Sequence, residues 1–244
     1  MSDAATEVRE FRIDIPEGEI IDLKSRLAST RWPDAETPDD WSQGLPLEYH
    51  QEFCKYWETE YDWYKTQEKL NKFPQFKSRF DGIDIHFVHV RSKENNARPL
   101  IITHGWPGSI VEFQKVIAPL TDPVGHGGKP EDAFHVVCPS LPGFGFSDKP
   151  TGTGWGVIKI AEVWNQLMLR LGYDRYFAQG GDWGSAVTTM IGLQNLGNCK
   201  GLHVNMPSSP PTKEALKKPD DKDKKALAAG QFYQQWDSGY SKQQ

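Results

Sequence analysis

The stretch Gly180-Gly181-Asp182-Trp183-Gly184-Ser185 decides the fold, because it places one carboxylate among small residues where a strand should turn sharply into a helix. A short apolar run, 176–178, precedes it, and the segment 186–191, which can be helical, follows it. Small residues permit a cramped turn and a close approach of helix to strand, so the central side chain projects outward. The pattern is typical of a nucleophile elbow with Asp182 as its nucleophile.

The residue type at the centre of the elbow indicates the chemistry. Serine would indicate acyl transfer, whereas aspartate indicates attack on an electrophilic carbon, which gives an ester on the enzyme that water must later cleave. A simpler interpretation is an N-cap aspartate between turn-forming glycines, which would need no chemistry. The order of strand, turn and helix around Asp182 favours the elbow.

Further apolar runs predict the sheet to which the elbow belongs. The segment 80–90 alternates around an Asp-Gly turn and predicts an antiparallel start. The runs 100–103 and 134–138 are separated by a helical stretch at 109–120, and the run 201–205 follows the elbow. Strands that alternate with helices predict a mainly parallel sheet flanked by helices on both faces, an α/β fold.

The first 79 residues differ from this core. Helical spacing of apolar residues predicts a helix around 20–27, and a second helical stretch is expected across 47–70. Aromatic stripes at helical spacing usually face a core, so we expect packing and not a cofactor site. The residues concerned are Tyr49, Tyr56, Trp57, Trp63 and Tyr64.

Composition excludes several classes of protein. The chain has 244 residues, 37% of them hydrophobic, and a formal net charge of −5, which argues against nucleic acid as a partner. No stretch approaches the roughly 20 apolar residues of a membrane span, and no leader pattern is seen, so a cytoplasmic location is expected. Cys54, Cys138 and Cys199 form no Cys-x-x-Cys pair, so we expect three buried thiols and neither metal nor cofactor.

Three unusual loops are expected at the carboxyl ends of the strands, where sites form in such sheets. They are His104 to Ser109 (HGWPGS), Leu141 to Asp148 (LPGFGFSD) and the elbow. Together these motifs resemble the α/β-hydrolase-fold epoxide hydrolases, most closely the microsomal and juvenile-hormone branch. The segment 12–33 resembles that branch's N-terminal meander. The resemblance implies a meander region at 1–79, the first part of the hydrolase core at 80–206 and the start of a lid at 207–244.

The resemblance also implies a reaction, the conversion of an epoxide and water into a vicinal diol. Asp182 would attack the less hindered epoxide carbon and form an alkyl ester. The backbone N–H groups of Trp106 and Trp183 would form the oxyanion hole, and their side chains would line the substrate pocket. Tyr240 stands where the family has a lid tyrosine that protonates the epoxide oxygen, and Tyr233 is the nearby alternative.

Three other polar residues have simpler interpretations. His104 precedes the oxyanion-hole residue, and the family uses this histidine to shape the loop. His203 falls within a predicted strand, and Asp148 is expected to brace its loop.

The resemblance implies further groups that this sequence does not contain: a second lid tyrosine, an acid and the histidine that activates water. His203 comes too early in the chain to be that base. We therefore expect a C-terminal fragment of the same protein to complete the domain, with lid loops near Gly239 and Lys242 suited to a nick. Asp182 without the base would be alkylated but would release product slowly.

Two alternatives remain at this point. A haloalkane dehalogenase also uses an aspartate elbow, but it usually has asparagine where this chain has Trp106. A non-catalytic ligand-binding protein with a hydrolase-like scaffold is the second, and it would form no covalent adduct. The preferred epoxide and the presence of a homodimer are left open by the sequence.

Overall fold

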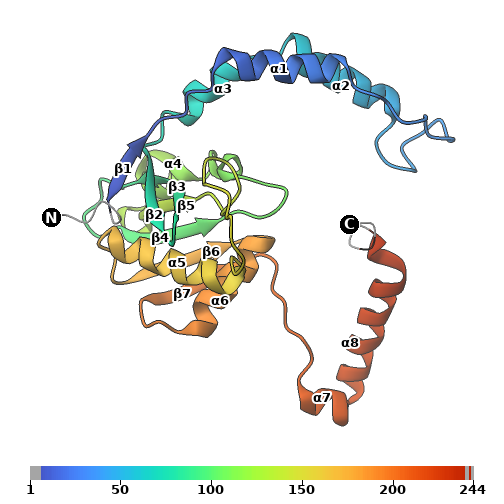
Figure 1. Cartoon of the computed structure of the whole chain (residues 1–244). Helices are drawn as coiled ribbons and strands as arrows, with labels where there is room; N and C mark the ends of the chain where they lie inside the picture. Colours follow the sequence, from blue (N-terminus) through green and yellow to red (C-terminus); the bar gives the residue numbers. More distant parts are fainter. Residues whose placement is uncertain (1–6, 240–241, 243–244) are drawn as a thin grey trace. The chain divides into compact units, whose positions relative to one another are not determined.

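The computed structural model describes residues 7–239 and 242. The chain divides into two compact units, Met1–Met206 and Pro207–Gln244. The first unit contains the sheet, and the second contains short helices (Figure 1). Within the described residues, no helix combines the length and the apolar character that a membrane crossing requires.

One sheet forms the centre of the first unit, in the order β1-β2-β3-β5-β4-β6-β7. The three pairs on the β1 side are antiparallel, and β5-β4, β4-β6 and β6-β7 are parallel. The predicted α/β sheet is thus confirmed, but it is mixed and gains β1, which the sequence did not predict. The strands are β1 Val8–Phe11, β2 Gln75–Phe80, β3 Ile83–Val90, β4 Arg98–Thr103, β5 Phe134–Pro139, β6 Tyr176–Gly180 and β7 Cys199–Val204.

The predicted hairpin is formed by β2 and β3. Asp81 and Gly82 both have positive φ, 45° and 89°, which a tight two-residue turn between twisted strands requires. Because β1 and most of β2 precede residue 80, the sheet starts inside the region expected to be meander.

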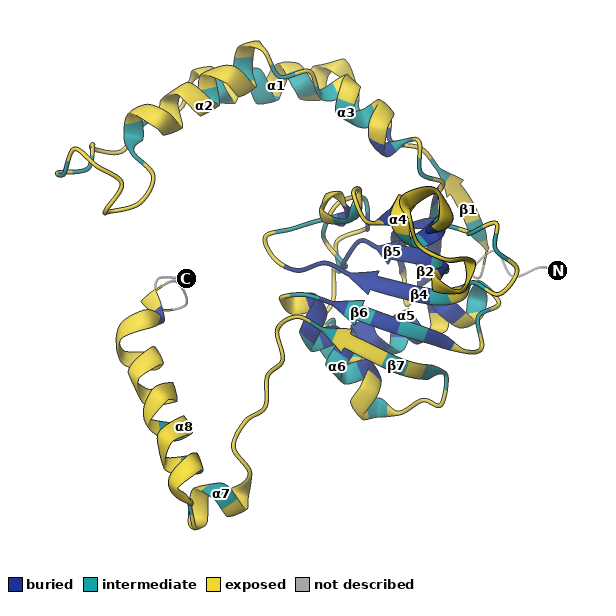
Figure 2. Cartoon of the chain, turned by 180° about the vertical axis from the view of Figure 1, so that it is seen from behind, coloured by how far each residue is buried: buried dark blue, intermediate teal, exposed yellow. Residues whose placement is uncertain are grey.

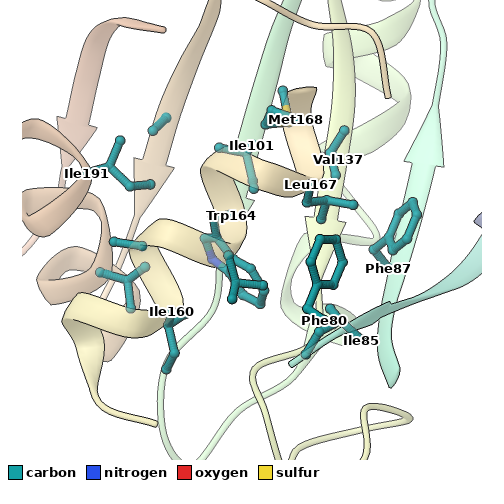
Figure 3. Packing of buried hydrophobic residues seen from close by; sticks show 14 of the residues in the cluster. Phe80, Ile85, Phe87, Ile101, Val137, Ile160, Trp164, Leu167, Met168 and Ile191 are labelled. Atoms are coloured by element: carbon teal, nitrogen blue, oxygen red, sulfur yellow. The ribbon is translucent and has the colours of Figure 1, made fainter. Parts of the chain in front are cut away.

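Alternate residues of the central strands face two separate cores. Ile101 and Val137 pack against α5 (Val157–Arg170) and α6 (Trp183–Gln194), which lie on one face of the sheet. Figure 3 shows Trp164, Leu167 and Met168 of α5 beside these strand residues. On the other face, the core contains residues of the 3₁₀ turn Ile110–Phe113 and of α4 (Ile117–Thr121). The inner strands β3, β5 and β4 are accordingly deeply buried, whereas the residues of the edge strands β1 and β7 are half-buried or exposed (Figure 2).

The helix expected across 109–120 is instead a 3₁₀ turn followed by the five-residue α4. Pro119 explains the difference, because a continuous α-helix would need its missing N–H to bond the carbonyl of Lys115. The sequence prediction omitted α5, although its apolar residues recur at helical spacing.

The N-terminal helices are α1 (Glu17–Ala28), α2 (Leu47–Thr59) and α3 (Trp63–Leu70). The predicted helix across 47–70 is broken because Asp62 is extended, and its side chain accepts the Tyr64 N–H at 3.0 Å as the N-cap of α3. The aromatic residues of this region pack less than expected. Tyr49, Tyr56, Trp57 and Tyr64 are exposed, and Tyr56 and Trp57 line an apolar cavity of about 620 Å³.

The second unit contains α7 (Lys213–Lys217), α8 (Asp221–Phe232) and a π-helical turn at Tyr233–Asp237. Thr212 and Asp220 cap the two helices by accepting the N–H groups of Ala215 and Asp223.

The expectation of three buried thiols is correct for one of them. Cys138 is buried, whereas Cys54 on α2 and Cys199 on β7 are half-buried.

Candidate active site

Asp182 lies between β6 and α6 with φ 50° and ψ −126°, a backbone conformation that residues other than glycine rarely adopt. Such strain costs on the order of 1–3 kcal/mol and persists only where the surroundings enforce it. The backbone therefore has the sharp strand-to-helix turn that the sequence predicts.

Two glycines make that turn possible, because a Cβ atom at either position would collide with neighbouring backbone. A Cβ on Gly180 would overlap the Gly184 carbonyl, and one on Gly184 would overlap the Thr103 carbonyl oxygen of the neighbouring strand. The hydroxyl of Ser185 donates to the Gly180 carbonyl at 2.8 Å and closes the turn. The small residues of the motif thus bring α6 directly onto β4 and β6.

The carboxylate of Asp182 is turned toward the loop that follows β4. Its Oδ1 accepts the backbone N–H of Trp106 at 2.7 Å. Asp182 occupies the N-cap position of α6, yet within the described structure its side chain makes no capping hydrogen bond. A Cβ on Gly105 would overlap this carboxylate, so the loop passes against it. The simple N-cap interpretation explains the position of Asp182 in the chain, but it does not explain the hydrogen bond from the Trp106 N–H to its carboxylate.

Trp106 lies in the loop after β4, and Trp183 follows Asp182 within the elbow. Both side chains are exposed, by 41% and 55%. Trp106 directs its N–H at the carboxylate. Trp183 is the first residue of α6, so its N–H belongs to the first turn, where a helix has no internal acceptors. The positive end of the α6 dipole also favours negative charge here.

His104 is buried, and both of its ring nitrogens are engaged. Its Nε2 accepts the Leu141 N–H at 3.1 Å, so its Nδ1–H donates to the Gly105 carbonyl at 2.9 Å. Burial lowers the pKa of His104, which keeps the imidazole neutral. The ring therefore shapes the loop and joins it to the segment after β5, in agreement with the sequence-based interpretation.

Asp148 braces its loop. Its Oδ2 accepts the Asp84 N–H at 2.9 Å, its own N–H donates to the Asp84 carbonyl, and its carbonyl accepts the Gly143 N–H. His203 is exposed on β7. The structure thus brings together Asp182, Trp106 and the three predicted loops. Tyr233 is exposed in the second unit, and Tyr240 lies outside the described residues.

Two residues near the elbow were missed from the sequence. Thr103 ends β4, where its carbonyl accepts the Gly181 N–H and its hydroxyl accepts the Trp164 indole N–H at 3.0 Å. The side chain of Asn205, directly after β7, lies against Gly181. A polar residue at the carboxyl end of an apolar run is the signal that could have identified both.

Comparisons with known proteins agree with this architecture. The family model described as "Epoxide hydrolase N terminus" matches residues 8–113, and the model "alpha/beta hydrolase fold" matches residues 98–236.

Three similar proteins show how far the similarity extends. A Stigmatella aurantiaca protein described as "Putative epoxide hydrolase" is 50% identical over 96% of this chain and 53% of its own length. Epoxide hydrolase 1 of Sus scrofa is 39% identical over 82% of this chain and 45% of its own. The crystal structure of juvenile hormone epoxide hydrolase from the silkworm Bombyx mori matches with a TM-score of 0.73 and 33% identity, covering 82% of this chain and 53% of that one.

The chain spans about half the length of the curated relatives it matches. The sheet, the elbow and the two matched models agree with one another, and the resemblance found from the sequence is confirmed. The chain therefore belongs to the α/β-hydrolase fold family and carries the epoxide hydrolase N terminus in front of that fold.

Proposed function

We propose that this chain carries the nucleophile of an epoxide hydrolase, which converts an epoxide and water into a vicinal diol through an ester on Asp182. The observation that carries the proposal is the Asp182 carboxylate. Its residue has a strained backbone at the elbow, its side chain makes no capping hydrogen bond to α6, and its Oδ1 accepts the Trp106 N–H. The family models and relatives support the same reaction class.

The hydrogen bond to Oδ1 distinguishes the two carboxylate oxygens. Oδ1 is occupied by the Trp106 N–H, so Oδ2 is the freer nucleophile. Attack by Oδ2 on the less hindered epoxide carbon forms a carbon–oxygen bond and breaks the ring bond. The departing oxygen then needs a proton, which a lid tyrosine can supply because a phenol stays protonated at neutral pH. Tyr240 is our candidate, with Tyr233 as the alternative.

Hydrolysis of the ester uses the same amide. Water attacks the carbonyl carbon of the Asp182 ester, and negative charge develops on Oδ1. The N–H groups of Trp106 and Trp183 are our proposed oxyanion hole for this charge. Collapse of the intermediate releases the diol and restores the carboxylate. Their exposed indole rings suit a lipophilic or aromatic epoxide.

The test is chemical trapping followed by a labelled single turnover. An aryl epoxide should add its mass once to the protein, and peptide mapping should place the adduct on Asp182. Asp182→Asn should form no adduct. Asp148→Asn is the matched control, because that loop-bracing side chain can still accept the Asp84 N–H. In H₂¹⁸O, a single turnover should put ¹⁸O into Asp182 and not into the diol. Label in the diol would mean direct attack by water and would overturn the proposal.

The two alternative functions predict different results. A haloalkane dehalogenase would release halide from a haloalkane faster than it opens an epoxide. A non-catalytic binding protein would leave Asp182 unmodified.

We also infer that a further polypeptide segment covers one face of the sheet and supplies the activating histidine and its acid. The support is an apolar hollow of about 700 Å³ on the face opposite α5 and α6. Its lining includes Leu100, Ile102, Phe113, Val116 and Phe177. Exposed apolar hollows of this size usually mark a contact surface.

Intact masses of the purified protein under denaturing conditions test this second inference. A companion species that co-purifies and is required for turnover supports it. Diol release at full rate by the 27.7 kDa chain alone would contradict it.

A further inference from the structure

His86 lies in the middle of β3 and is fully buried, yet the proposed reaction does not use it. Its ring is packed edge-on between Phe11 of β1 and Phe146 of the loop after β5, at centroid distances of 5.0 and 5.3 Å. Its nitrogens bond the Ser140 hydroxyl and the Gln75 side-chain oxygen, both at 2.9 Å. Burying an imidazole costs free energy unless both of its nitrogens have hydrogen-bond partners, and here both partners are buried side chains. The position of His86 therefore calls for an explanation.

The direction of each hydrogen bond in this network is determined. The Gln75 amide nitrogen donates to the Leu70 carbonyl at 3.0 Å, so its oxygen faces His86 and must accept from Nε2–H. Nδ1 of His86 is then an acceptor, and the Ser140 hydroxyl donates to it. The His86 backbone N–H donates to the Ser147 hydroxyl, which itself donates to the Ser140 carbonyl at 2.8 Å.

One end of the network reaches the residues that form the candidate site. Ser140 and Ser147 begin and close the loop 140–148, and Leu141 of that loop donates its N–H to His104. His104 donates to the Gly105 carbonyl, which belongs to the same peptide group as the Trp106 N–H. That N–H bonds Asp182. Hydrogen bonds and adjacent peptide groups thus connect His86 to the amide that holds the carboxylate.

The other end of the network reaches the N-terminal region. Gln75 also donates to the Asn71 side chain at 3.4 Å. Asn71 makes a paired contact with the backbone of Ile13, accepting its N–H at 2.9 Å and donating to its carbonyl at 2.8 Å. Ile13 is buried, and it leads from β1 into α1.

We propose that His86 is a positioning residue, which transmits the docking of the N-terminal segment around Ile13 to the loop 140–148 and so fixes the Trp106 N–H against Asp182. This gives the N-terminal region a role in organising the site without touching substrate. The part that concerns alkylation of Asp182 rests on the proposed function.

Two substitutions separate the ends of the network. His86→Asn can keep an acceptor near the Ser140 hydroxyl but is too short to reach Gln75. His86→Gln can reach Gln75 but leaves Ser140 without its acceptor. Ser140→Ala is a milder variant that removes one bond with little loss of volume, in case the histidine variants fail to fold. His89→Asn is the matched control, because His89 is buried on the same strand and bonds Tyr173 away from the loop.

Amide hydrogen exchange in the full chain is the first measurement, and it does not depend on the proposed function. In the His86 and Ser140 variants, the Leu141 and Trp106 amides should exchange roughly tenfold faster, while amides of β4 and α6 keep their protection. His89→Asn should lower overall stability without this local change. Unchanged exchange at Trp106 in every His86 and Ser140 variant would make His86 an ordinary core residue and overturn the proposal.

The second measurement is the rate of Asp182 alkylation by an aryl epoxide. We expect the rate at saturating epoxide to fall roughly tenfold in the His86 variants, with the half-saturating concentration little changed. A normal rate together with faster exchange at Trp106 would also overturn the positioning role. Failure of the unmodified protein to be alkylated would count against the proposed function alone, because the exchange result stands without it.

Discussion

The absence of a side chain at Gly184 lets helix α6 lie directly against strand β4. A methyl group there would overlap the Thr103 carbonyl oxygen, which belongs to the backbone of a central strand and cannot move away. We expect Gly184→Ala to lower the free energy of unfolding by about 2–4 kcal/mol, since overpacking against backbone is not relieved by a rotamer change. Urea denaturation measures it. Gly18→Ala in α1 is the control, because no atom lies within 4 Å of the added carbon, and its stability should be equal or slightly higher.

The buried histidines make stability depend on pH. Burial lowers the pKa of His86 to about 3, whereas in the unfolded chain it has its ordinary value of 6.5. Below pH 6.5 the His86 imidazole binds a proton in the unfolded chain, whereas in the folded protein it stays neutral until about pH 3. The contribution to stability is therefore complete above pH 6.5 and is lost as the pH falls toward 3. His89, whose pKa burial lowers to about 4, acts in the same direction.

Denaturant unfolding at a series of pH values from 7.5 to 4.5 measures this loss. His86→Asn should show a shallower dependence than the unmodified protein. The same slope in both proteins would mean that His86 is not the group that resists protonation.

Among the elements, α5 contributes most to the core on its face of the sheet. Trp164 lies fully buried among the core residues of this face (Figure 3). Its indole N–H donates to the Thr103 hydroxyl at the end of β4. Trp164→Ala should cost about 3–5 kcal/mol, because it leaves a large cavity and an unpaired hydroxyl. Thermal unfolding would show it. Trp41→Ala is the comparison, since that ring is 61% exposed and its loss should be nearly neutral; equal effects would contradict the assignment of α5 to the core.

The elements also show what local sequence can and cannot predict. β4, β5 and β6 were found from their apolar runs because buried strands need such runs. β1 was missed because Val8–Phe11 is short and half polar, and its pairing with β2 joins residues about 70 positions apart, as in Val8 with Ser78. The break at Asp62 and the interruption between Phe113 and Ile117 were not predicted, because in each case a single residue outweighs the helical periodicity of a longer segment.

The same contrast holds for the candidate site. Asp182 and Trp106 were found because their motifs have a fixed order. Their hydrogen bond confirms the predicted meeting of the loops, although their roles in catalysis stay predictions. The network of Gln75, His86 and Ser140 was not foreseen. Its residues are far apart in the chain and ordinary in type, so only the folded sheet brings them together.

At the scale of the whole molecule, the apolar hollow on the sheet is the feature that should govern solubility. Val116, directly before α4, lines it and is 42% exposed. Val116→Glu should weaken binding of an apolar dye and slow aggregation, with little change in stability, because this side chain belongs to neither core cluster. Leu193→Glu is the control, since Leu193 is exposed on α6 and is not among the lining residues of the hollow. Equal dye binding by all three proteins would show that the hollow is not the aggregation surface.

The unequal burial of the three thiols has a practical consequence. Burial raises the pKa of Cys138 and also that of Cys199, whose thiol donates to the Gly201 carbonyl, so both form little of the reactive thiolate at neutral pH. Cys54 on α2 is half-buried and is the remaining thiol. A fluorophore or spin label applied under mild conditions should therefore attach chiefly to the N-terminal helices. The unaltered protein should thus take up such a label mainly on the region that the Ile13 contact ties to the sheet.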